Sequence, residues 1–162
     1  MTHDTRQEVD PFAGLTRSPE RVVAELTSVD WADLQSLVER VNAHSGAFGS
    51  FQPAEQIGEN HWATGYPVHN ELVREATQFV YERQLVLLGL NWTEWDEGQR
   101  RYQRGEFIDE IAQLDLREVL AYITMLIRAD RFSEGALLDA FDRRVMPALL
   151  NRLLDFKPRG RT

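Results

Sequence analysis

The chain has 162 residues, of which 43% are hydrophobic and 27% are charged, a composition typical of one folded globular domain. Its formal net charge of -8 and pI near 5.0 disfavour nucleic acid as a partner, because nucleic-acid binding draws most of its affinity from neutralising phosphates. The absence of cysteine excludes disulfides, thiolate zinc sites and cysteine nucleophiles.

The two ends of the chain are polar. Residues 1–17 show little periodicity and are predicted to form an N-terminal arm, and residues 157–162 a flexible basic tail. Met1 to Val9 contains no apolar signal-peptide segment, and no run of about eighteen apolar residues follows. We therefore expect a cytoplasmic protein that does not enter a membrane, with a single α-helical domain over residues 18–156.

Two helices are expected at the start of this domain. Ser18 followed by Pro19 is typical of a helix N-terminus, with a capping side chain and a proline in the first helical position. Apolar residues between Trp31 and Val41 recur three and four positions apart, which predicts a second helix with one buried stripe. Asp30 is expected to cap this second helix.

A long stretch between His44 and Pro67 is rich in Gly, Ser and Pro and is predicted to be a loop. Loops of this length are uncommon in compact domains unless they are functional or disordered. The stretch also contains four aromatic residues, Phe48, Phe51, Trp62 and Tyr66. These aromatics indicate that parts of the loop pack on the body, and they make it a candidate wall of a site.

The remainder of the chain is expected to be helical. The pattern predicts a helix over residues 68–88 that stops at Gly89, and a turn followed by a helical start over 91–98. Asp115 and Glu118 have the spacing of a capping box before a wide apolar face, and Ser133 and Pro147 mark two further helices. With no alternating strand pattern evident, the predicted fold is all-α, a compact single-domain bundle of about six or seven helices with one long aromatic-containing loop.

Motifs for metal or nucleophilic chemistry are absent from the sequence. The four histidines lack the paired spacing of a helical metal site, so no metal or cofactor is expected. Glu106, Asp109 and Glu110 would share a helix face that could bind a hard cation, but a solvated acidic face is the preferred interpretation. Trp92 and Trp95 could form a ligand wall or a partner anchor, and core packing is preferred for them.

The segment Arg128 to Gly135 concentrates charge where one apolar helix ends and the next begins. In one interpretation it is structural: the arginines complement the helix dipole, and Glu134 pairs with one of them to fix the turn. In the other, the guanidinium groups of Arg128 and Arg131 face a pocket and hold a carboxylate or phosphate in bidentate fashion.

The same segment, continued to Phe141, resembles a pattern in a family of uncharacterised bacterial proteins, domain of unknown function six-five-zero-eight. Asp130 stands where that family has glutamate, Ser133 where it has cysteine and Glu134 where it has aspartate. Weaker similarities lie at Tyr66-Pro67 and in the leucine-rich segment 149–154, so the resemblance covers roughly residues 62–156. It implies an α-helical fold and no known activity.

Two functions remain open at this point. The leading hypothesis is a non-enzymatic binding or protein-interaction module with an unknown protein partner, and homodimerisation is a further expectation. The alternative is a small-molecule-binding protein or enzyme with an arginine-lined pocket for an anionic ligand. The residues proposed for that pocket are Arg128, Arg131, Glu134, Trp62 and Trp92, with Glu134 as a candidate acid or base.

Overall fold

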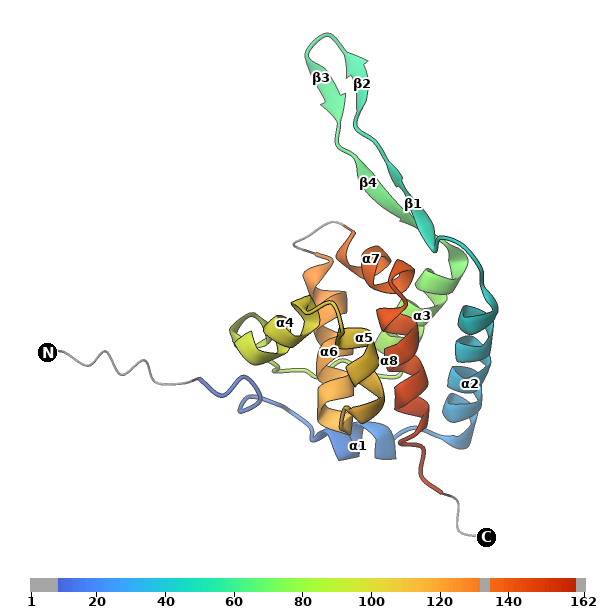
Figure 1. The fold of residues 1–162 in the computed structure, drawn as a ribbon, viewed down its shortest axis with the longest axis vertical. Helices are drawn as coiled ribbons and strands as arrows, with labels where there is room; N and C mark the ends of the chain where they lie inside the picture. The colour runs from blue at the N-terminus through green and yellow to red at the C-terminus, as the bar shows by residue number, and fades with distance from the viewer. Residues whose placement is uncertain (1–8, 132–134, 160–162) are drawn as a thin grey trace, which may run out of the picture.

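The computed structural model describes residues 9–131 and 135–159 and shows a helical body with a projecting β-hairpin (Figure 1). The described residues form eight α-helices: α1 Pro19–Ala24, α2 Ser28–Ala43, α3 Glu71–Glu82, α4 Asp96–Gln103, α5 Phe107–Glu110, α6 Leu116–Ala129, α7 Ala136–Asp142 and α8 Val145–Leu154. Two 3-10 helices, η1 Trp92–Glu94 and η2 Ile111–Gln113, and four strands complete the fold. The all-α prediction is therefore wrong.

The strands form one long β-hairpin, residues 49–69, where the sequence predicted a loop. β1 Gly49–Gln52 pairs antiparallel with β4 Tyr66–His69, and β2 Glu55–Gly58 pairs antiparallel with β3 His61–Ala63. The register places Phe51 opposite Pro67 and Gln56 opposite Trp62, with an irregularity between Gln56 and Gly58. The hairpin has no second sheet or helix layer along most of its length, so most of its side chains are exposed.

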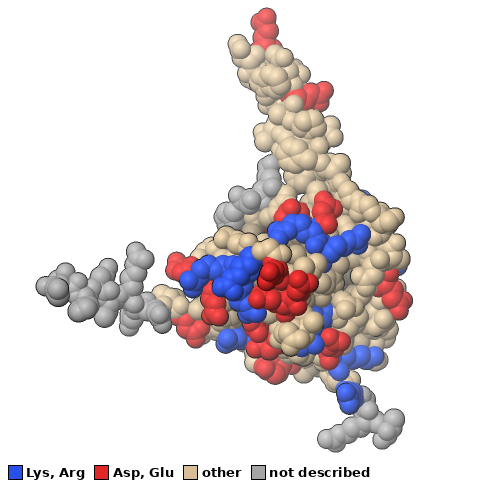
Figure 2. All heavy atoms as spheres, viewed as in Figure 1, with Lys and Arg blue, Asp and Glu red and all other residues tan. Residues whose placement is uncertain are grey.

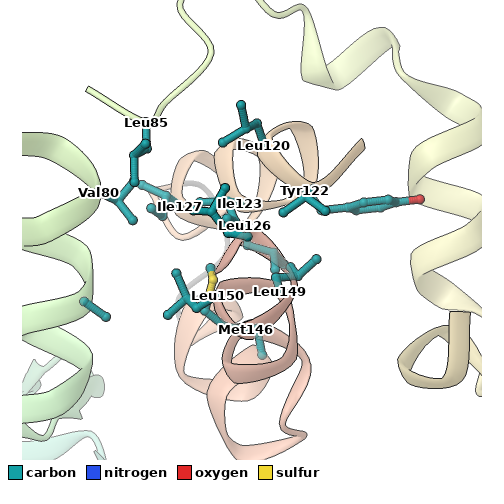
Figure 3. Packing of buried hydrophobic residues seen from close by; sticks show 14 of the residues in the cluster. Val80, Leu85, Leu120, Tyr122, Ile123, Leu126, Ile127, Met146, Leu149 and Leu150 are labelled. Atoms are coloured by element: carbon teal, nitrogen blue, oxygen red, sulfur yellow. The ribbon is translucent and has the colours of Figure 1, made fainter. Parts of the chain in front are cut away.

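Helix α6 is the centre of the hydrophobic core. Its capping box is confirmed. The Asp115 side chain accepts from the Glu118 N–H at 2.8 Å, and the Glu118 carboxylate accepts from the Asp115 N–H at 3.1 Å. Nine consecutive residues of α6, from Val119 to Ile127, are buried. Figure 3 shows this helix above Met146, Leu149 and Leu150 of α8, with Val80 and Leu85 at its side.

The N-termini of the first two helices follow local rules with one difference from expectation. Ser18 caps α1 and Pro19 is its first residue, as predicted. Helix α2 begins at Ser28. The Thr27 hydroxyl accepts from the Asp30 N–H, and the Asp30 carboxylate accepts from the Thr27 N–H. The prediction of Asp30 as the cap is wrong: Asp30 is the third helical residue, in a capping box.

Helices α2 and α3 are joined by ion pairs as well as by core packing. Arg83, at the end of α3, binds Asp30 at 2.7 Å and Asp33 at 3.3 Å, and Arg40 of α2 binds Glu75 of α3 at 2.6 Å. These contacts orient α3, whose first residues follow directly from β4.

No helix of the described residues is long and apolar enough to cross a membrane.

Candidate functional site: the hairpin and its root

The hairpin is anchored to the body through Phe48, the residue before β1. Phe48 is fully buried, and its ring lies 4.7 Å from that of His44 and 5.4 Å from that of Phe141. Its backbone N–H donates to Asp142 Oδ1 at 2.8 Å, and its carbonyl accepts from the Asn70 N–H at 2.8 Å. Both arms of the hairpin, β1 and β4, are thereby held on the helical body at one point, which we call the hairpin root.

Close backbone packing also shapes the hairpin root. A Cβ atom added to Gly49 would lie 2.1 Å from the Val68 carbonyl oxygen and 3.0 Å from a methyl group of Leu138. No side chain fits in that space, so glycine is required where β1 leaves the body. On the other side, Asn70 caps α3 by accepting from the Val73 N–H at 3.0 Å, and so β4 leads directly into the helix.

The hairpin exposes large apolar side chains along its whole length. Of the ten large hydrophobic residues that are exposed in the described part of the chain, five lie in the hairpin: Phe51, Ile57, Trp62, Tyr66 and Val68. Trp62 is 63% exposed and Ile57 is 70% exposed. Figure 2 shows the hairpin almost without charge, with only acidic atoms near its tip, while the arginines gather on the helical body. Residues 45–70 contain no lysine or arginine.

A cavity of about 380 Å³ lies beside the hairpin root, bordered by the end of β4, by α3 and by the ends of α6 and α7 that face each other. Its polar lining includes His69 of β4, Arg74 of α3 and Arg131, which follows α6. Ile127 and Leu137 form apolar walls. Segments about sixty residues apart in the chain thus meet at one site.

The structure separates the residues that the sequence grouped into one arginine-lined pocket. Arg131 lines the cavity at the hairpin root, whereas Arg128 lies partly buried in the last turn of α6 and does not line it. Glu134 lies outside the described residues. Trp62 is in β3, in the outer half of the hairpin and away from the end of α6 (Figure 1).

The two neighbouring tryptophans pack differently from each other. Trp92 lines a separate groove beside Tyr102 and Met125 and is partly buried against the core. Trp95 is buried, with its ring 4.6 Å from that of Tyr122, in agreement with the preferred interpretation of core packing. Neither residue borders the cavity at the hairpin root.

In the acidic segment 106–110, Glu106 and Asp109 are exposed, as the preferred interpretation of a solvated acidic face expects, and Glu110 lies near an arginine of α4. Glu110 lies 3.9 Å from Arg101 Nε, and Arg101 also binds Glu118. Beside them, burial raises the pKa of Tyr122 to about 12, and its hydroxyl donates to the Gly98 carbonyl at 3.0 Å. Within the described ranges, no group of three His, Asp or Glu side chains is arranged to hold a metal ion.

Two contributors to the site were missed by the sequence analysis. His69 and Arg74 flank the junction of β4 and α3, and only the three-dimensional fold brings them to Arg131. For the hairpin itself, the even spacing of Trp62, Tyr66 and Val68 is compatible with a strand, but a break at Thr64-Gly65 places Trp62 in β3 and the other two in β4.

Together, the fold and the hairpin define a class of small protein in which a helical body carries a projecting β-hairpin with exposed aromatic residues and no lysine or arginine. The chain belongs to the family of unknown function DUF6508, whose model matches residues 26–159. The match begins well before residue 62 and therefore includes α2 and the whole hairpin, contrary to the expectation that the first sixty or so residues are unmatched. Searches of curated proteins and of solved structures found no match.

Proposed function

We propose that the protein is a protein-interaction module and that the β-hairpin is its docking element. The observation that carries this proposal is the concentration of exposed apolar side chains on an element that projects from the body. Contiguous exposed apolar surface is characteristic of interaction sites, and tryptophan and tyrosine dominate the binding energy of protein interfaces. Trp62 and Tyr66 supply both residue types.

The charge of the hairpin favours a protein partner over other macromolecules. Its only charged residues are Glu55 and Glu59, so it has no cation with which to neutralise phosphate groups. Nucleic-acid binding and binding to anionic lipid both depend on such cations. An apolar, weakly acidic surface suits a protein surface that offers apolar contacts.

The partner that we propose is a second copy of this chain, joined through the β1 edges. Proline removes a backbone donor from a strand, and Pro67 lies in β4, whereas β1 contains no proline. The outer edge of β1 therefore remains competent to pair. Two identical edges pair antiparallel about a two-fold axis, which gives a closed dimer with a four-stranded sheet.

Sedimentation equilibrium tests this proposal directly. We expect the wild-type protein to dimerise, and we expect the triple variant Phe51→Ser, Trp62→Ser, Tyr66→Ser to remain monomeric. Leu88→Ser is the matched control, because Leu88 is an exposed apolar residue of the body, 51% exposed against 58% for Phe51. This control should dimerise like the wild type.

Two results would refute the proposal. One is a wild-type protein that stays monomeric up to about 1 mM, where even an association of about 4 kcal/mol is half complete. The other is a dimer that the triple variant leaves intact while Leu88→Ser disrupts it. Far-ultraviolet circular dichroism of each variant verifies that the helical body is folded.

A further inference from the structure

The cavity at the hairpin root is lined by two arginine side chains that have no partner among the described residues. The backbone N–H groups of Arg74 and Arg131 bond within their own turns, but neither guanidinium group has a hydrogen bond or ion pair to a residue that the structure describes. By contrast, Arg83 and Arg101, elsewhere in the body, each bind carboxylates. Uncompensated guanidinium groups at one cavity favour an anionic ligand, since their planar forks match the geometry of carboxylate and phosphate oxygens.

A third group in the cavity points to a ligand independently of the arginines. The Nε2 atom of His69 is buried and has no hydrogen-bond partner. Buried polar atoms are nearly always hydrogen-bonded in folded proteins, so a lone one calls for an explanation. A ligand can supply that partner if the imidazole ring turns so that Nε2 faces the cavity, because this nitrogen is closed to solvent in the structure.

The local charge balance is opposite to that of the whole chain. Asp130 is the one carboxylate among the described residues that line the cavity, and its Oδ1 accepts from the Leu137 N–H at 3.1 Å. Among the lining residues that the structure describes, two arginines and one aspartate leave one net positive charge, on a protein of net charge -8. The apolar walls of Ile127 and Leu137 reduce the local dielectric and strengthen the attraction for an anion.

We propose that this cavity binds the phosphate group of a small phosphate monoester, with Arg74 and Arg131 as the phosphate ligands and His69 as a third contact. A phosphate monoester carries close to two negative charges at neutral pH and offers three terminal oxygens, enough for two guanidinium groups and an imidazole. The volume of about 380 Å³ leaves space for the attached organic group, for which the exposed ring of Tyr81 forms part of the rim.

The experiment is a calorimetric titration of the full chain with phenyl phosphate, and with inorganic phosphate, at constant ionic strength. We expect Arg74→Gln and Arg131→Gln each to weaken binding by at least about tenfold, the size of one charge-assisted contact. His69→Phe should also weaken it. The matched control is Arg128→Gln, which removes the same charge from the same end of α6 but lies outside the cavity lining.

Three outcomes would overturn the proposal: no heat of binding with either probe up to about 10 mM, well beyond the millimolar range of weak binding; equal losses in Arg128→Gln and Arg131→Gln, which would show that only general charge matters; or full binding by both cavity variants. Thermal melting without ligand verifies that each variant is folded. The triple hairpin variant should bind phenyl phosphate normally, so this result is independent of the dimerisation test.

Discussion

Asp142→Ala tests whether a single carboxylate holds the hairpin to the body. The Phe48 N–H donates to Asp142 Oδ1 at 2.8 Å in a partly buried setting and has no second acceptor among the described residues. Leaving a buried donor without a partner costs about 1–3 kcal/mol. At about 2–4 °C per kcal/mol for a protein of this size, the melting temperature should fall by about 2–12 °C.

Asp142→Asn is the control, because an asparagine retains a side-chain oxygen at the same position while losing the charge. We expect it to cost less than about 1 kcal/mol, the difference between a charged and a neutral acceptor. Urea unfolding gives the stabilities, and amide hydrogen exchange locates the effect. In Asp142→Ala, the amides of Phe48 and Asn70 should exchange faster than in the wild type, whereas the amides of α6 should exchange at the wild-type rate.

The reasoning would be refuted by an Asp142→Ala protein whose unfolding free energy lies within about 0.5 kcal/mol of the wild type, the range of an ordinary surface substitution. It would also be refuted if exchange increased uniformly over the molecule. In that case Asp142 would contribute to the stability of the whole body, and Phe48 would anchor the hairpin by its buried ring alone.

Three further predictions concern backbone space and pH. Gly49→Ala should lower the melting temperature and the protection of β1 amides, while Gly58→Ala, whose added Cβ would meet its nearest neighbour at 3.7 Å, should be tolerated. The backbone hydrogen bond from Thr27, together with Arg83, holds the pKa of Asp30 below its ordinary value. The contribution of the ionised Asp30 to the free energy of unfolding is therefore complete above the unfolded pKa of about 3.9 and is lost as the pH falls further. Urea unfolding at graded acid pH should show a shallower loss of unfolding free energy in Asp30→Asn than in the wild type. Because burial raises the pKa of Tyr122 to about 12, stability should fall as the pH rises from about 10, where the unfolded phenol ionises, to about 12, and Tyr122→Phe should show a weaker alkaline loss in the same assay.

Several helices could be predicted from the sequence because they carry local signals. The prediction of one helix over residues 68–88 is wrong: Val68 and His69 belong to β4, and α3 spans Glu71–Glu82. Ser18 with Pro19, and Asp115 with Glu118, mark helix starts through bonds that span three residues or fewer, and both are present in the structure. The one-sided apolar spacing in α2 and α6 reports burial against a core that the rest of the chain supplies. Such signals do not depend on how the helices are arranged.

The hairpin could not be predicted in the same way, because it has no buried face to produce a continuous alternation. Its pairing is interrupted at Pro53-Ala54 and again at Thr64-Gly65, so no run of four or more alternating residues stands out. The strands are recognisable only once Phe48 and Asn70 are known to lie side by side. The same holds for the cavity: Arg131 was among the predicted residues, but its neighbours come from the β4–α3 junction.

The region that matches the family model and the region that folds as a unit do not share a boundary. The match starts at residue 26, immediately after α1, yet Val22 and Val23 of α1 are buried and the helix packs on α6. A chain shortened to the matched region would uncover part of α6 and lose the ion pair of Arg17 with Glu25 at 2.5 Å. Expression work on relatives should therefore keep at least ten residues upstream of the match, roughly the length of a capped two-turn helix.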